Sequence, residues 1–100
     1  MARTPRVSKA TPEPELEPPT NVVSQLELLD LFRHKAVHEL VIVEVAPDFF
    51  RVEAIIAWRV GRWTLMGAKG PRTYRSFSTL IRALKVMGVG HTVIRLELLL

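Results

Sequence analysis

The chain has 100 residues, a formal net charge of +4 and no cysteine. This length allows one domain, and a hydrophobic content of 48% is too high for a wholly disordered chain. The lack of cysteine excludes disulfides and thiolate metal ligands. Apolar runs are shorter than the roughly 18–20 residues that span a bilayer, and the segment after Met1 lacks the apolar stretch of a secretory signal. We therefore expect a cytoplasmic protein that makes no membrane contact, and the positive charge favours an anionic partner.

Residues 1–20 are predicted to form a disordered, partly polyproline arm. The segment holds five of the seven prolines together with charges of both signs. It cannot bury enough apolar surface to offset the entropy of ordering it. An alternative role is a basic tip, formed by Arg3, Arg6 and Lys9, that contacts phosphate or a partner. Residues 21–100 are predicted to fold as a single small domain.

The first predicted element is a helix over about residues 21–35. Ser24 and Glu27 have the spacing of a capping box, and Thr20 or Asn21 are alternative N-caps. Apolar side chains at spacings of three predict one buried stripe along this helix. The stripe consists of Leu26, Leu29 and Phe32, joined by Val22 or Leu28.

Four strands are predicted to follow the first helix. The first is a continuous run of β-branched residues, which is typical of a strand buried on both faces. The second alternates apolar and polar residues, and this pattern places Trp58 on its buried side. Gly61 favours a tight connection to the third strand, and the side on which Trp63 lies stays open. The expected strands are residues 38–45, 50–59, 62–68 and 73–77.

A second helix is predicted to begin after an N-cap at Ser78 and to end before Gly88, which suits the left-handed C′ position. Its expected buried stripe is Leu80, Ile81, Leu84 and Met87. Residues 91–98 are predicted to form a last strand, and the apolar residues 98–100 need cover from the sheet or from a second subunit. The predicted fold is therefore α+β, in the order α-β-β-β-β-α-β, with two helices on one face of an antiparallel meander of about four strands.

The strongest functional signal lies between Glu53 and Glu97, where the sequence has eight basic residues and no carboxylate. A solvated surface normally mixes both signs, so this window predicts a positive surface for an anionic partner. Interleaved aromatic residues favour nucleic acid, and DNA rather than RNA. The predicted contact residues are Arg59, Arg62, Lys69, Arg72, Arg75, Arg82 and Lys85. The alternative is a protein–protein adaptor or homodimer that acts through an edge strand or the apolar residues 98–100.

No residue pattern predicts catalysis, a cofactor or a metal site. Asp30, His34 and His38 would share a face on a continuous helix, but the helix is expected to end between the two histidines. The segment from Gly67 to Thr73 is rich in glycine and basic residues, yet it lacks the spacing of a phosphate-binding loop and is predicted to be a basic hairpin turn. The sequence therefore predicts a non-enzymatic binding protein.

The segment from Gly61 to Leu80 resembles the small accessory proteins of plasmids and integrative elements that are called ParC-type partition-associated proteins. The shared pattern is a W-x-L strand, a K-G-x-R turn and an R-x-F-x-S/T-L entry into a helix, followed by glycine and a closing strand over about residues 38–98. The resemblance implies an accessory role in plasmid partition or mobile-element maintenance and transfers no catalytic residue. The predicted architecture also resembles the arm-type DNA-binding domains of tyrosine recombinases, from which it departs by an extra first helix and an extra last strand.

Overall fold

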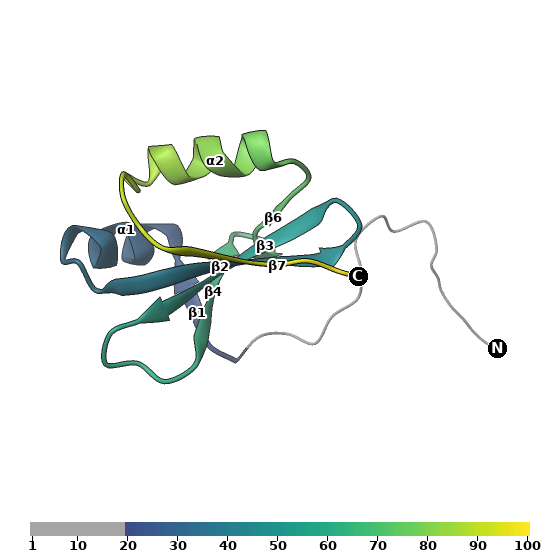
Figure 1. The fold of residues 1–100 in the computed structure, drawn as a ribbon. Helices are drawn as coiled ribbons and strands as arrows, with labels where there is room; N and C mark the ends of the chain where they lie inside the picture. The colour runs from purple at the N-terminus through teal and green to yellow at the C-terminus, as the bar shows by residue number, and fades with distance from the viewer. Residues whose placement is uncertain (1–19) are drawn as a thin grey trace.

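The computed structural model describes residues 20–100, so the predicted arm falls on residues 1–19, outside the described part of the chain. These residues form two helices and seven strands (Figure 1). In chain order they are β1 (Val22–Ser24), α1 (Gln25–Arg33), β2 (Val37–Ala46), β3 (Phe49–Ile56), β4 (Arg62–Gly67), β5 (Gly70–Pro71), β6 (Thr73–Tyr74), α2 (Phe77–Val86) and β7 (Ile94–Glu97). The α+β class is therefore confirmed. Neither helix of this described part is long and apolar enough to cross a membrane.

The strands form one mixed sheet in the order β1-β4-β3-β2-β7. The central strands β2, β3 and β4 pair antiparallel, as the predicted meander requires. The two edge strands differ from the prediction, because β1 pairs parallel to β4 and β7 pairs parallel to β2. The purely antiparallel meander is therefore wrong. A chain that leaves the sheet for α2 and returns as β7 beside β2 can reach that edge in either direction, and no local pattern fixes which.

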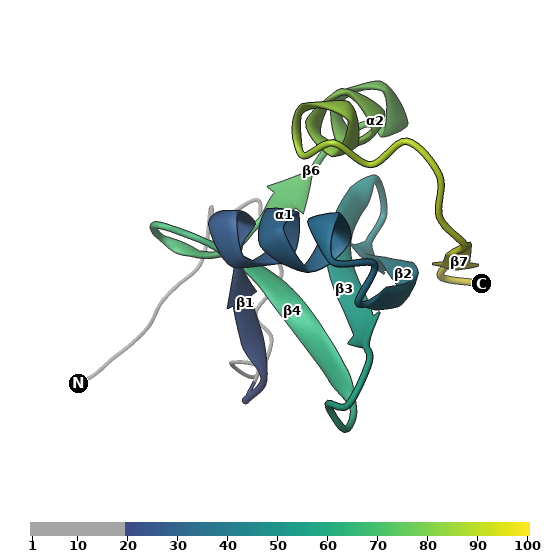
Figure 2. The same cartoon turned by 90° about the vertical axis from the view of Figure 1, so that its left-hand side faces the viewer.

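Both helices pack against the same face of the sheet, which we call the helix face. Alternate side chains of β2 and β3, such as Leu40, Ile42, Val52 and Ala54, join buried residues of α1 and α2 in one core. The opposite face, which we call the open face, carries neither α1 nor α2, the two helices of the described residues (Figures 1 and 2). Val41 points to the open face and is nevertheless 0% exposed.

The first helix is shorter than predicted because its expected first turn forms strand β1. The β-branched Val22 and Val23 pair with the edge of β4 instead of starting a helix. Ser24 is confirmed as the N-cap, since its Oγ accepts a hydrogen bond from the backbone N–H of Glu27 at 3.1 Å. The predicted stripe is confirmed in part: Leu29 and Phe32 pack partly buried against the core and Leu28 is buried. Leu26 is instead 79% exposed, and Leu31 is buried in addition.

The second helix begins two residues earlier than predicted. Its N-cap is Ser76, whose Oγ accepts a hydrogen bond from the N–H of Thr79 at 3.2 Å, so the prediction of Ser78 as the cap is wrong. The predicted end is confirmed. Gly88 has a φ of +83°, and the N–H of Val89 donates to the carbonyl of Leu84 at 3.0 Å, as in a Schellman motif.

The prediction that Trp58 lies in the core is wrong. Strand β3 ends at Ile56, so the alternation that placed Trp58 inside does not reach it. Residues 57–61 form a longer connection in place of the expected tight turn, and Trp58 adopts a φ of 55° with 78% of its surface exposed. Trp63, on β4, packs partly buried against the core.

Candidate nucleic-acid interface

The seven predicted contact residues divide into two groups. Arg59 and Arg62 are partly buried, and each forms ion pairs with glutamate. The other five are exposed, and within residues 20–100 none of them has a carboxylate within 4 Å. We call these five the hairpin–helix set: Lys69, Arg72, Arg75, Arg82 and Lys85.

Arg59 holds the connection between β3 and β4 against the first helix. Its Nη2 donates to Oε2 of Glu27 at 2.8 Å, and its guanidinium carbon lies 4.8 Å from the centroid of the Trp63 ring. The Nε1 of Trp63 in turn donates to the carbonyl of Val60 at 3.1 Å. The guanidinium is therefore occupied by an ion pair and a cation–π contact that fix the loop.

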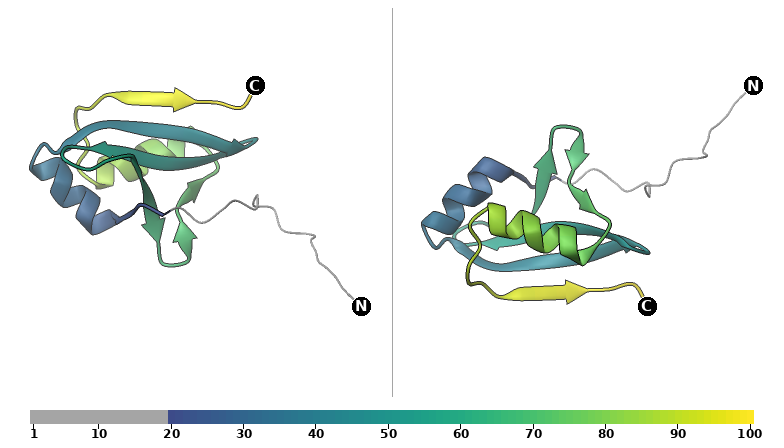
Figure 3. Two further views of the ribbon diagram at one scale, coloured as in Figure 1. Left: turned by 90° about the horizontal axis from the view of Figure 1, so that it is seen from below. Right: turned by 90° about the horizontal axis from the view of Figure 1, so that it is seen from above.

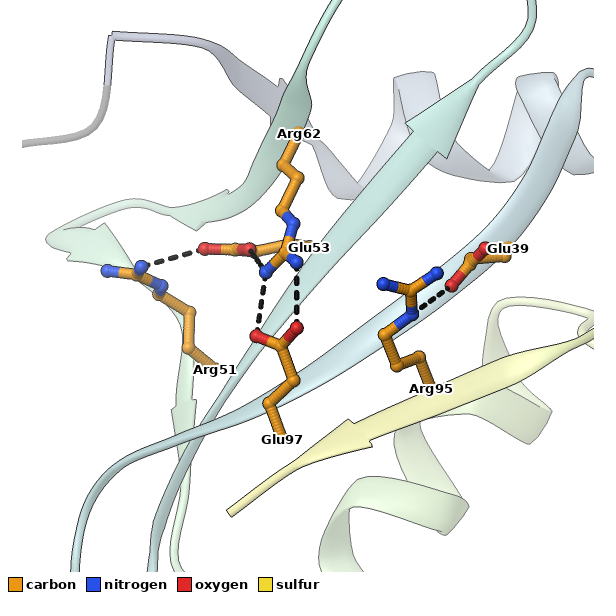
Figure 4. A network of polar contacts seen from close by, with 6 residues as sticks. All are labelled: Glu39, Arg51, Glu53, Arg62, Arg95 and Glu97. Atoms are coloured by element: carbon orange, nitrogen blue, oxygen red, sulfur yellow. Dashed lines mark hydrogen bonds and ion pairs between the residues drawn. The ribbon is translucent and has the colours of Figure 1, made fainter. Parts of the chain in front are cut away.

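Arg62 belongs to a charge network on the open face (Figure 4). Its two Nη atoms donate to the two carboxylate oxygens of Glu97 at 2.8 and 2.7 Å, and Nη1 also lies 3.3 Å from Oε1 of Glu53. Arg51 donates to the other oxygen of Glu53 at 2.7 Å. Beside these residues, Nε of Arg95 lies 2.8 Å from Oε2 of Glu39. Three arginines thus face three glutamates, and the open face is balanced in charge.

The network has clear electrostatic consequences for Arg62 and Glu97. The hydrogen bonds from Arg62 hold the pKa of Glu97 below its usual range, with the nearby positive charges acting in the same direction. The hydrogen bonds to Glu97 and Glu53 raise the pKa of Arg62 above its usual value. Both groups are therefore charged at neutral pH. The bidentate pair joins β4 to β7 across the two intervening strands, so it fastens the edge strand to the sheet.

Two members of the hairpin–helix set come together over α2. Arg72, which follows the β4–β5 hairpin, and Arg82, on α2, line one shallow cleft with Gln25, Tyr74 and Thr79. Among residues 20–100, no carboxylate lines this cleft. The view of Figure 3 shows the hairpin projecting beside α2, which explains how residues ten apart in sequence share one hollow.

The hairpin itself places Lys69 beside Arg72. Both line the hollow formed by residues 67–73. Residues 68 and 69 join β4 to β5, which confirms the predicted hairpin turn. Gly67 is needed for this arrangement, because a Cβ at that position would lie 2.6 Å from Cδ of Arg72. Glycine therefore lets the Arg72 side chain lie across the turn.

The last two members of the set lie apart from this cluster. The guanidinium of Arg75 lies 4.9 Å from the centroid of the Phe49 ring, at the first residue of β3. Lys85 lines a different groove, between α2 and the segment that leads to β7. Arg72 therefore shares one hollow with Lys69 and another with Arg82, whereas Arg75 and Lys85 line neither of them.

The histidines do not gather into a metal site. The Nδ1 of His34 lies 2.8 Å from the carbonyl oxygen of Asp30, at the C-terminal end of α1, while His38 belongs to β2. Within residues 20–100 no three His, Cys, Asp or Glu side chains are placed to share a metal ion.

Sequence reasoning missed the network on the open face. Alternation along β3 was sufficient to place Arg51 and Glu53 on one face, but the contact of Arg62 with Glu97 joins residues 35 apart in sequence. Comparison of the chain with protein-family models, curated proteins and solved structures gives no match. Its function must therefore be inferred from its own residues.

Proposed function

We propose that the protein is a non-enzymatic accessory protein that binds nucleic acid electrostatically, DNA in preference to RNA, through the hairpin–helix set. The observation that supports this proposal is the cleft shared by Arg72 and Arg82, two exposed guanidinium groups in a hollow that no carboxylate of the described residues lines. The resemblance of residues 38–98 to ParC-type proteins extends the proposal to plasmid partition or mobile-element maintenance.

The chemistry of the cleft suits phosphate oxygens. A guanidinium without an internal carboxylate keeps its planar set of donors for a bidentate contact with phosphate. The hydroxyl of Thr79 accepts from Ser76 at 3.0 Å, so its own proton remains available for donation, and the amide of Gln25 adds a second neutral donor. Such contacts hold a backbone without reading bases, so little sequence preference is expected.

Arg59 and Arg62 are not part of the proposed contact set. Their donors already serve Glu27, Glu53 and Glu97, and an incoming phosphate would have to displace those carboxylates. These carboxylates already neutralise the two guanidinium groups, so a phosphate gains less from them than from an arginine without such a partner. The proposed interface therefore consists of Lys69, Arg72 and Arg82, with Arg75 and Lys85 in support.

The test is a titration of a labelled DNA duplex by fluorescence anisotropy at about 50 mM and about 200 mM salt. The wild-type protein is expected to bind at the lower concentration and to lose affinity at the higher one. A plot of log K against log salt has a negative slope, and each phosphate contact contributes about one unit to its magnitude because it releases about one counterion. Replacing both Arg72 and Arg82 by alanine should therefore reduce the magnitude of the slope by about two.

Arg33→Ala is the matched control for Arg82→Ala. Both residues are exposed helical arginines, so the two substitutions make the same change in net charge. If Arg33→Ala weakens binding as much as Arg82→Ala does, net charge and not the cleft drives the interaction. Absence of binding at the lower salt concentration would refute the proposal altogether.

A second candidate function is protein–protein contact through β7. This edge strand and the residues after it expose Ile94, Leu96, Leu98 and Leu99, each to 45% or more. An exposed apolar edge strand is a ready site for strand addition.

A further inference from the structure

Strand β7 presents a free edge whose hydrogen-bonding groups can be assigned. Among the strands of residues 20–100 it is the last in the sheet order, with β2 as its one neighbour along that order. The N–H of Leu40 donates to the carbonyl of Val93 at 2.9 Å, and Leu40 is in register with Ile94. In a parallel ladder this register turns the amides of residues 93, 95 and 97 toward β2. The N–H and C=O groups of Ile94, Leu96 and Leu98 therefore point outward.

The two faces of this edge have different chemistry. On the helix face, Ile94 and Leu96 are in register with the core residues Leu40 and Ile42, and each is 45% exposed. On the open face, Arg95 and Glu97 alternate with them. Nothing in the sequence of residues 94–98 blocks pairing, since the segment has no proline, glycine or lysine.

We propose that β7 pairs antiparallel with β7 of a second copy of the chain, centred on Leu96. This register places Leu96 opposite Leu96 of the second copy and Ile94 opposite its Leu98. The outward groups at these positions then meet as hydrogen-bonded pairs. On the open face, Arg95 lies opposite Glu97 of the second copy, and Glu97 opposite its Arg95. The inference is independent of nucleic-acid binding.

Charge complementarity selects this register over its neighbours. Outward amides in β7 lie only at even-numbered positions, so each hydrogen-bonded pair must join two even-numbered residues. The alternative antiparallel registers are therefore centred on Arg95 or on Glu97, one residue to either side of Leu96. One step toward the N-terminus places Arg95 opposite Arg95, and one step toward the C-terminus places Glu97 opposite Glu97. Like charges directly opposite each other destabilise a strand pair. Only the register centred on Leu96 pairs both charges with their opposites.

Arg95 and Glu97 can make these contacts without giving up their present ones. Arg95 meets Glu39 through its Nε, at 2.8 Å, and both of its Nη groups remain as donors. Each carboxylate oxygen of Glu97 accepts one hydrogen bond from Arg62 and has a second lone pair. Pairing would therefore extend the charge network of each copy into that of the other.

The apolar side of the edge fits the same partner. A groove lined by Ile81, Leu84, Val89 and Ile94 lies between α2 and the start of β7. In the proposed register Leu98 of the second copy lies opposite Ile94, at the rim of this groove. The pairing thus covers exposed apolar surface on both copies, in an isologous contact with two-fold symmetry.

In the described part of the chain, no helix or strand covers this edge. β7 lies along the outer margin of the sheet, and neither helix extends beyond it (Figure 3). The two-fold axis of an antiparallel strand pair is perpendicular to the sheet, so the dimer would have one continuous sheet with all helices on the same side. The contact is short, so a weak dimer is expected.

The test is sedimentation equilibrium of the wild type and three variants, between about 1 µM and about 1 mM. The wild type should dimerise within this range. Arg95→Glu places Glu opposite Glu97 of its partner, and Glu97→Arg places Arg opposite Arg95, so each single variant should raise the dimer Kd at least about tenfold. Arg33→Glu makes the same charge change on α1 and should leave the Kd unchanged.

Mixing the two single variants gives the decisive result. In a heterodimer of Arg95→Glu with Glu97→Arg, every cross-strand pair joins opposite charges again, although the contacts within each chain remain broken. The mixture should therefore associate where neither variant does alone. Amide hydrogen exchange must first show that β7 stays protected in both variants, because Glu97→Arg removes the Arg62 pair that fastens this strand. With β7 in place, failure to form the heterodimer, or a dimer that tolerates both single substitutions, would overturn the proposed register. A wild-type protein that stays monomeric up to the highest concentration would overturn the pairing itself and leave the edge to another protein's strand.

Leu96→Pro supplies a test on the backbone. The N–H of Leu96 points away from β2, so proline removes an outward donor without removing a hydrogen bond of the sheet, as at other edge strands. The variant should keep the circular dichroism spectrum of the wild type and lose dimerisation. A folded Leu96→Pro protein with unchanged dimer Kd would contradict the proposal.

Discussion

Lys35 carries a backbone strain that a single substitution can remove. It follows the C-cap of α1 with a φ of 55°, and the N–H of the next residue, Ala36, donates to the carbonyl of Leu31 at 2.8 Å. This Schellman position is normally occupied by glycine, because a Cβ in the left-handed region costs roughly 1 kcal/mol. Lys35→Gly should therefore raise the free energy of unfolding by up to about 1 kcal/mol, measured by urea denaturation.

The control for this prediction is Lys35→Ala, which removes the same charge and keeps the Cβ. It should be no more stable than the wild type. If alanine stabilises as much as glycine does, loss of the lysine charge and not relief of strain explains the gain.

Glu53 is the buried centre of the open-face network. It is 6% exposed and hydrogen-bonds both Arg51 and Arg62. Glu53→Gln keeps its shape but leaves the guanidinium of Arg51 without an anionic partner, so the variant should lose about 3 kcal/mol of stability. The urea midpoint measures this loss. Asp48→Asn also removes one carboxylate, at an exposed turn whose φ of 63° asparagine tolerates, and should change the midpoint little.

At the residue scale, two helix-end signals were predictable, whereas the N-cap of α2 and the long-range partners were not. The caps at Ser24 and Gly88 follow from side-chain chemistry within four residues of each helix end, and the structure confirms both. The partners of Arg59 and Arg62 come from residues 32 and 35 positions away. A one-sided charge window counts cations but says nothing of the carboxylates that the fold brings from outside the window.

At the element scale, the attachment of β7 should depend on pH through Glu97. A carboxylate whose folded pKa is lowered stabilises the protein above its unfolded pKa, which is about 4.3 for glutamate. That stabilisation disappears as the pH falls through the lower, folded value. Glu97→Gln should therefore be less stable than the wild type at neutral pH. The two proteins should be equally stable at a pH where Glu97 of the wild type is protonated in the folded and in the unfolded state.

Urea denaturation of both proteins from about pH 7 down to about pH 2 measures this difference. The pair is partly exposed, so added salt should shrink the difference at neutral pH. A difference that persists unchanged at the lowest pH would show that the substitution acts through packing and not through the charge of Glu97.

Strand existence was easier to predict than strand pairing. The central hairpins of β2, β3 and β4 connect consecutive strands through short loops, so the sequence order also gives their order in the sheet. The parallel pairings of β1 and β7 depend on where α1 and α2 return the chain, which periodicity does not encode. Strand β1 was read as helix because the edge of β4 that pairs with Val22 and Val23 comes from residues about forty positions later.

At the scale of the whole molecule, the two proposals together predict a dependence on duplex length. A two-fold axis perpendicular to the sheet places both copies of the cleft at Arg72 and Arg82 on the same side as the helices. Two sheets of five strands in line extend about 48 Å at about 4.8 Å per strand. A duplex of about 24 base pairs, at 3.4 Å each, can therefore contact both clefts, whereas one of about 8 base pairs can contact only one.

A longer duplex offers more non-specific sites, which alone raises the affinity somewhat. The wild-type dimer should gain more than this, because once one cleft is bound the second cleft binds the same duplex intramolecularly. Leu96→Pro leaves the cations in place and should lose this advantage while keeping the affinity for the shorter duplex. Anisotropy titrations of both proteins with both duplexes measure the four constants. Equal length dependence in the two proteins would show that each copy binds DNA alone, even where the sedimentation data establish the dimer.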